Sequence, residues 1–248
     1  MTANTLKFCI SIAIYVISFS TRAQEVEKQV DLDESIETPV AVLNDTLSKK
    51  KEKYGLRIGF DILKSTISFI DEDFTGIEIV SDLRFQKNLY IAIEFGATER
   101  TDQEDFLNYT SKGGYAKVGA NYNLYKNWLD MNNEIYVGVR YGFSSFSQKL
   151  NEFTPNYYGT YFDVPTYTSN IEVDGLTAHW FEFVIGLKVE LFKNFFLGTS
   201  ISMKNMISQD QPANFLNLYI PGFERVYVNN KGFSANYTMS YVIPVFSK

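Results

Sequence analysis

From Tyr54 onward, apolar residues alternate with polar or small ones in eight runs. In the first run, Ile58 and Phe60 fall on one face and Arg57 on the other. This period of two is typical of β-strands. The runs cover residues 55–62, 77–85, 89–96, 116–124, 134–143, 181–191, 195–204 and 233–243. Their lengths are close to the roughly 9–11 residues that a tilted strand needs to cross the hydrocarbon layer of a bilayer.

The connections between the runs are alternately short and long. Each short connection contains Lys-Asn shortly after an aromatic residue, with one intervening residue, Gln86, in the first copy. The Lys-Asn pairs are Lys87 and Asn88, Lys126 and Asn127, and Lys193 and Asn194. Because paired residues share a face, the first and third copies are predicted to be three-residue hairpin turns, 86–88 and 192–194, with Asn in a left-handed conformation. The middle copy opens a longer turn over 126–133. The long connections are predicted to be loops over 64–73, 98–113, 148–175 and 207–232.

Eight strands with short turns at one end and long loops at the other predict an all-β fold. We expect an eight-stranded antiparallel up-and-down transmembrane β-barrel with short periplasmic turns and long extracellular loops. A soluble secreted lipocalin-like binding barrel is the alternative, because alternation alone does not say which face points outward.

The size of the side chains on the two faces favours the transmembrane barrel over the soluble one. An eight-stranded barrel encloses little more than packed side chains, and Phe, Tyr, Ile and Leu dominate one face, while Gly, Ser and charged residues dominate the other. The charged face is nearly balanced in sign, as a paired interior network requires. The expected network comprises Arg57, Asp61, Glu78, Asp82, Arg84, Glu94, Lys117, Glu134, Arg140, Glu182, Lys188, Glu190 and Lys204.

The N-terminal part differs in composition from the barrel region. Residues 1–23 have the basic start, apolar core and small-residue cleavage pattern of a secretory signal peptide. Residues 24–53 have no clear period and no aromatic residue, so we expect a flexible periplasmic linker. The barrel domain then covers 54–248. These features predict the outer membrane of a Gram-negative bacterium as the location.

Net charge and cysteine content exclude several classes of partner and site. The formal net charge is -6, so nucleic acid is not an expected partner. The single cysteine, Cys9, lies inside the expected signal peptide, which excludes disulfides and thiolate sites from the mature chain. We expect no metal site and no cofactor. The expected partners are outer-membrane lipid and lipopolysaccharide, the outer-membrane assembly machinery and an extracellular ligand.

The eight strands and three short turns resemble the small outer-membrane barrels of the OmpX and OmpA-transmembrane type. The resemblance covers 54–248 and rests on architecture. Within this group the chain most resembles an uncharacterised family of such barrels, with Asn-Leu-Tyr-Ile-Pro-Gly-Phe at 217–223 as a distinctive loop phrase. We expect two departures from the pattern. The first is the lack of a C-terminal peptidoglycan-binding domain. The second is Pro244 in the last strand, where a missing N–H favours a strand end or bulge.

Two functions are weighed for such a barrel. The first is a structural or surface-interaction role without catalysis, in which aromatic residues of the outer loops bind a ligand. The candidate binding residues are Tyr157, Tyr158, Tyr161, Tyr167, Phe215, Tyr219 and Phe223.

The second function is a lipid-acting serine hydrolase. Its candidates are Ser145 or Ser147 as nucleophile, His179 as base and Asn205 to orient the imidazole. By the alternation of side chains, these residues all lie on the lipid-facing side of their strands, near the outer ends. An open pore is not expected, because eight strands leave a filled lumen.

Overall fold

The computed structural model describes residues 53–125, 132–155, 165–212, 215–227 and 229–247. The predicted signal peptide, nearly all of the predicted linker, and Lys126 and Asn127 of the middle turn lie outside these residues.

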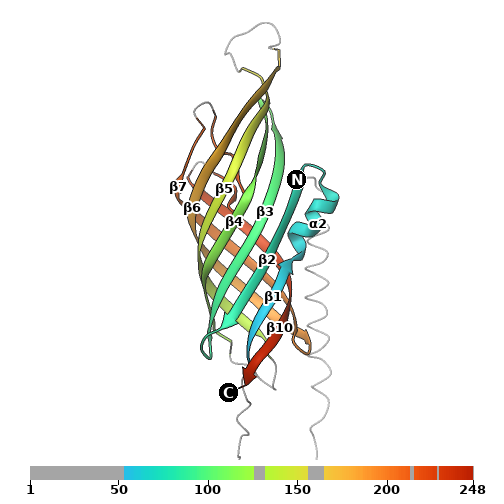
Figure 1. Cartoon of the computed structure of the whole chain (residues 1–248), viewed down its shortest axis with the longest axis vertical. Helices are drawn as coiled ribbons and strands as arrows, with labels where there is room; N and C mark the ends of the chain where they lie inside the picture. The colour runs from blue at the N-terminus through green and yellow to red at the C-terminus, as the bar shows by residue number, and fades with distance from the viewer. Residues whose placement is uncertain (1–52, 126–131, 156–164, 213–214, 228, 248) are drawn as a thin grey trace, which may run out of the picture. The chain divides into compact units, whose positions relative to one another are not determined.

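Eight antiparallel strands close into a barrel (Figure 1). The ring order is β1-β10-β7-β6-β5-β4-β3-β2. Barrel strands that follow one another along the chain are neighbours in the ring, and the first strand, β1, closes the ring against the last, β10. This confirms the predicted fold class. The strands are β1 (Lys53–Asp61), β2 (Phe74–Arg84), β3 (Leu89–Glu104), β4 (Leu107–Asn123), β5 (Glu134–Phe153), β6 (Tyr167–Phe192), β7 (Phe195–Gln209) and β10 (Lys231–Ser247).

Three further elements are short. A nine-residue helix, α2 (Ile62–Ile70), follows β1, and a small hairpin of β8 (Tyr219–Ile220) and β9 (Glu224–Arg225) lies between β7 and β10. Within the described residues, no helix is both long and apolar enough to cross a bilayer.

The large apolar side chains of the strands point away from the barrel interior. Phe181, Ile185 and Ile201 are each more than half exposed, whereas Glu182 and Lys204, on the other face of the same strands, are buried. A continuous apolar outer surface around a charged interior is the arrangement of a membrane-spanning barrel. The lipocalin-like alternative requires the opposite polarity and is therefore wrong.

The two described turns at the inner end differ in detail. At the first, the Phe85 N–H donates to the Leu89 carbonyl at 2.9 Å. At the other, Phe192 pairs with Phe195, so the turn has two residues, and the expected three-residue loop over 192–194 is wrong. An irregularity between Glu190 and Phe192 takes up the extra residue and preserves the faces. Asn194 adopts the expected left-handed conformation, with φ 66°. Asn88 in the first turn does not have a positive φ, so the same expectation for that turn is wrong.

The outer connections contain more regular structure than predicted. β3 and β4 continue as a hairpin to a turn at Asp105 and Phe106, where a loop over 98–113 was expected. β5 and β6 likewise stay paired from Glu134 to Phe153, through most of the expected loop 148–175. The region expected to form the first outer loop contains α2. Beyond the lipid the outward face of a strand meets water instead of hydrocarbon, so apolar residues are no longer required on that face although pairing continues.

Candidate functional site

Charged side chains close the inner end of the barrel. The two terminal guanidinium nitrogens of Arg57, Nη2 and Nη1, donate to the Glu134 carboxylate at 2.5 and 3.2 Å. The Arg57 guanidinium also stacks on the ring of Phe196, 4.4 Å from its centroid. Asp82 bridges Arg57 to Lys188. The inner mouth is therefore filled by paired ions and an aromatic ring.

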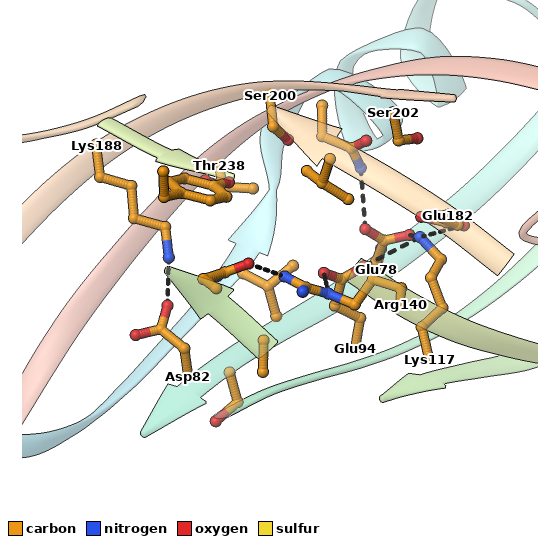
Figure 2. A pocket seen from close by; sticks show the side chains of 17 residues that line it. Glu78, Asp82, Glu94, Lys117, Arg140, Glu182, Lys188, Ser200, Ser202 and Thr238 are labelled. Atoms are coloured by element: carbon orange, nitrogen blue, oxygen red, sulfur yellow. Dashed lines mark hydrogen bonds and ion pairs between the residues drawn. The ribbon is translucent and has the colours of Figure 1, made fainter. Parts of the chain in front are cut away.

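The middle layer is a second ionic cluster (Figure 2). Lys117 lies 3.2 Å from Glu78 and 3.0 Å from Glu94, and the Arg140 Nε donates to Glu94 at 3.0 Å. Arg140 also donates to the Asn121 side-chain carbonyl at 2.8 Å. A cavity of about 40 Å³ lies among these groups. Such a volume holds a few water molecules at most.

A segment of the last outer connection closes the outer end. We call residues 217–225, which include the β8–β9 hairpin, the plug segment. The Lys204 ammonium donates to the carbonyls of Gly222 and Phe223 at 2.8 and 3.3 Å. Glu224 lies within 4 Å of both Lys204 and Lys64. These bonds fix the plug segment to the barrel wall.

Aromatic packing completes the plug. Phe223 is fully buried and meets Trp180 edge to face, with the ring centroids 5.8 Å apart. Trp180 in turn donates its indole N–H to Glu182 at 2.7 Å. Gly222 has a φ of 80°, and a Cβ atom there would lie 2.5 Å from Cγ of Tyr115. Glycine is thus required for this close approach.

The structure brings most of the predicted ionic network together. Its interior members make hydrogen bonds or ion pairs with one another, and Asp61 caps α2. Arg84 and Glu190 instead lie at the inner rim, where Arg84 donates to the Lys87 carbonyl and Glu190 accepts from the Asn194 N–H. The sequence analysis missed Lys64 and Tyr115, which both bond to Glu78.

The predicted binding aromatics separate into two groups. Tyr219 and Phe223 are buried in the plug segment, and Phe215 is partly buried. The expectation that Tyr219 and Phe223 form an outer binding surface is therefore corrected: both pack inside the barrel. The signal that was overlooked is the Pro-Gly turn inside a short apolar run, which folds the run back on itself. Tyr157, Tyr158 and Tyr161 lie outside the described residues.

Tyr167 belongs to an exposed aromatic tip. It stacks on Phe153, with ring centroids 5.7 Å apart. The adjacent Thr154 N–H donates to the carbonyl of Phe106, which is itself half exposed. We define Phe106, Phe153 and Tyr167 as the aromatic tip. It lies at the end of the sheet formed by the outer parts of β3, β4, β5 and β6, which we call the projecting sheet.

The projecting sheet has a free edge. Pairing between β6 and β7 ends at Ala178 and Gln209, whereas β6 begins at Tyr167 and pairs with β5 on its other side. Residues 167–176 therefore have a strand neighbour on one side only, among the described residues. At about 3.3 Å per residue, this edge is roughly 30 Å long.

The hydrolase candidates do not form a triad. The His179 Nδ1 lies 2.8 Å from the Tyr141 hydroxyl, and its ring packs on Phe143. His179 pairs across the strands with Phe143 and Ser208, whereas Ser145 pairs with Thr177 and Asn205 with Phe181. Among the described residues, no hydrogen bond joins His179 to Ser145, Ser147 or Asn205. The arrangement is that of an aromatic residue pair in the interfacial belt.

No group of three or more potential metal-ligating side chains is found in the described part of the chain.

A family model described as a domain of unknown function, DUF6048, matches residues 5–248. The chain belongs to this family. No curated protein matches it. Among solved structures, the attachment invasion locus protein Ail of Yersinia pestis is similar, with a TM-score of 0.37 and 9% sequence identity over 77% of this chain and 98% of that chain. At this level the likeness adds nothing to the argument, and the membrane assignment of this DUF6048 member rests on its own closed barrel and apolar outer surface.

Proposed function

We propose that this protein is a non-enzymatic outer-membrane barrel that anchors a protein-binding sheet at the cell surface. The observation that carries the proposal is the contrast between a closed barrel and a long, partly unpaired projecting sheet. The interior is filled by ion pairs at the inner end and by the plug segment at the outer end. A filled barrel of this kind supports anchoring rather than transport.

The projecting sheet has the properties of a recognition surface. Residues 167–176 have β5 on one side and no strand on the other among the described residues. Such an edge is a template on which an extended segment of another protein adds as a strand. The Ile171 N–H donates to the Ser169 hydroxyl at 3.3 Å, and an added strand would have to replace this bond. The aromatic tip offers exposed rings beside this edge, and aromatic residues are frequent anchors in binding interfaces. Exposed Glu172 and Asp174 on β6 favour a basic partner segment.

A peptide array tests this proposal. Protein in lipid nanodiscs is applied to immobilised ten-residue extended peptides that differ in net charge and apolar alternation. We expect binding to basic alternating peptides, and about tenfold weaker binding by the double variant Phe153→Ser, Tyr167→Ser, because two aromatic contacts are lost. Phe192→Ser removes an exposed aromatic residue at the opposite end of the barrel and is the matched control. Equal binding by the double variant and wild type would refute the proposed surface.

The hydrolase alternative is tested separately. We expect neither wild-type protein nor His179→Ala to release fatty acid from phospholipid or lipid A in mixed micelles, because His179 bonds to Tyr141 rather than to a serine. Fatty-acid release that His179→Ala abolishes would establish the hydrolase instead.

A further inference from the structure

The barrel wall has a gap in its outer half, between β2 and β10. Strand β1 pairs with β2 only from Leu56 to Phe60, and its pairing with β10 ends at Asp61 and Thr238. Farther out, residues 74–78 of β2 pair only with β3, and residues 231–237 of β10 pair only with β7. Helix α2 stands beside β2 at this level, where a continuing β1 would otherwise join the two strands (Figure 1).

Side chains replace main-chain pairing on both sides of α2. On the β2 side, the Ser68 hydroxyl accepts from the Gly76 N–H at 2.7 Å and lies 3.1 Å from the Gly76 carbonyl. On the β10 side, the Asp61 carboxylate accepts from the Tyr237 N–H at 3.3 Å and from the Asn236 amide at 2.8 Å. Asp61 also caps the first turn of the helix through the Leu63 N–H. The helix thus closes the wall with a few side-chain hydrogen bonds.

The inward face of α2 is tied to the plug segment. Lys64 is buried, and its ammonium donates to Glu78 at 2.6 Å and to the Tyr115 hydroxyl at 2.9 Å. The same ammonium lies 3.7 Å from Glu224 of the plug segment. Lys64 is therefore the ionic link between the helix in the wall and the outer closure.

The outward face of α2 is apolar and exposed. Phe69 is 91% exposed and Ile70 69%, and they extend the apolar surface of Phe60 and Ile77 on the adjoining strands. Outward movement of the helix would place these side chains deeper among lipid chains, which costs little for apolar groups. The same movement would open the outer part of the barrel toward the lipid.

We propose that α2 is a movable section of the barrel wall, a lateral gate whose closed position is set by the plug segment through Lys64. Opening the wall at α2 breaks the side-chain bonds of Ser68, Asp61 and Lys64. Opening it between β4 and β5 breaks a ladder that extends from Leu107 to Asn123. Because main-chain ladders in lipid are costly to separate, α2 is the weakest place in the wall. Displacement of the plug segment removes Glu224 from Lys64 and loosens the gate.

Amide hydrogen exchange in lipid nanodiscs, followed by mass spectrometry or NMR, tests the gate. In wild-type protein, the amides of α2 and of Gly76 are expected to exchange together and at least about tenfold faster than those between β4 and β5, as one cooperative opening unit. Glu224→Gln is expected to increase the α2 exchange rate about threefold or more. The matched control is Glu104→Gln. Glu104 on β3 pairs at the exposed rim with Arg225, the neighbour of Glu224 in the plug segment, but does not approach Lys64. This variant is expected to leave α2 exchange unchanged.

A second variant distinguishes local opening from general loosening. Ser68→Ala removes the bond to Gly76 and should accelerate exchange of α2 and Gly76 while the β4–β5 amides keep their wild-type rates. The proposal is overturned if α2 is as protected as β4–β5 in wild-type protein, or if Glu224→Gln and Glu104→Gln give the same α2 rates. Acceleration of all strands together in Ser68→Ala would also overturn it.

Discussion

Arg57 on β1 and Glu134 at the start of β5 face each other across the barrel interior, with the guanidinium Nη2 2.5 Å from the carboxylate Oε1. The two strands lie on opposite sides of the ring, so this pair spans the lumen rather than joining neighbours. Both side chains are buried. This bond closes the inner mouth, so we expect the stability of the barrel to depend on both partners.

Arg57→Met should destabilise the barrel by about 3–5 kcal/mol, because Glu134 and Asp82 lose their shared cation while remaining buried. The free energy of unfolding is measured by urea titration of protein in lipid vesicles. The control is Arg225→Met, which removes an exposed ion pair with Glu104 and should cost less than about 1 kcal/mol. Equal losses in the two variants would contradict a structural role for the Arg57 pair.

Gly222→Ala should expel the plug segment, since the new Cβ collides with the Tyr115 ring and the residue must adopt a positive φ. Trp180 then loses its contact with Phe223 and becomes accessible to iodide quenching, measured in a Trp128→Phe background. Gly175→Ala is the control, because Gly175 also has a positive φ but its Cβ would meet no atom within 4 Å. If Trp180 remains shielded in Gly222→Ala, the plug is not held by this contact.

Protonation of Asp210 should loosen the outer end of the β6–β7 pair. The hydroxyl and N–H of Thr177 donate to the Asp210 carboxylate at 2.7 and 3.0 Å and hold the pKa of that carboxyl below its usual range. A lowered folded-state pKa gives a stabilisation that is present above the unfolded pKa and lost as the pH falls through the folded value. After correction for the slower intrinsic exchange in acid, the Thr177 amide is therefore expected to lose protection at acidic pH, measured by NMR hydrogen exchange.

The Thr101 N–H, which donates to the main-chain carbonyl of Asp73 at the same end of the barrel, is the internal reference for that titration. Asp210→Asn should abolish the difference between neutral and acidic pH at Thr177. A Thr177 amide whose exchange, corrected for the intrinsic pH effect, follows that of Thr101 would contradict this assignment.

Apolar alternation predicts the barrel strands only where one face meets lipid. Phe181 and Ile185 alternate with Glu182 and Gly186 because lipid selects one set and the lumen the other. Beyond the bilayer this selection stops, and the outer parts of β3 and β4 have polar residues on both faces although pairing continues to Glu104 and Leu107. Strand limits outside the membrane therefore require the main-chain pairing itself.

The candidate sites were predictable to different degrees. The nearly equal numbers of positive and negative residues on the polar face of the strands predicted an ionic interior. Lys64 was not included in that prediction, because it lies in a helix rather than a strand. Asp61 as an N-cap was the local signal for this helix. The buried positions of Tyr219 and Phe223 depend on contacts with Gln148 and Trp180, which lie far away in the sequence, and no local pattern reports such contacts.

Flotation of the refolded chain with liposomes on a density gradient tests most directly that this is a closed membrane barrel. The apolar outer surface predicts that the protein floats with the lipid, resists extraction by carbonate or urea, and migrates faster on gels when it is not heated. Mature protein that stays folded and monomeric in the lipid-free fractions, without detergent, would contradict the account.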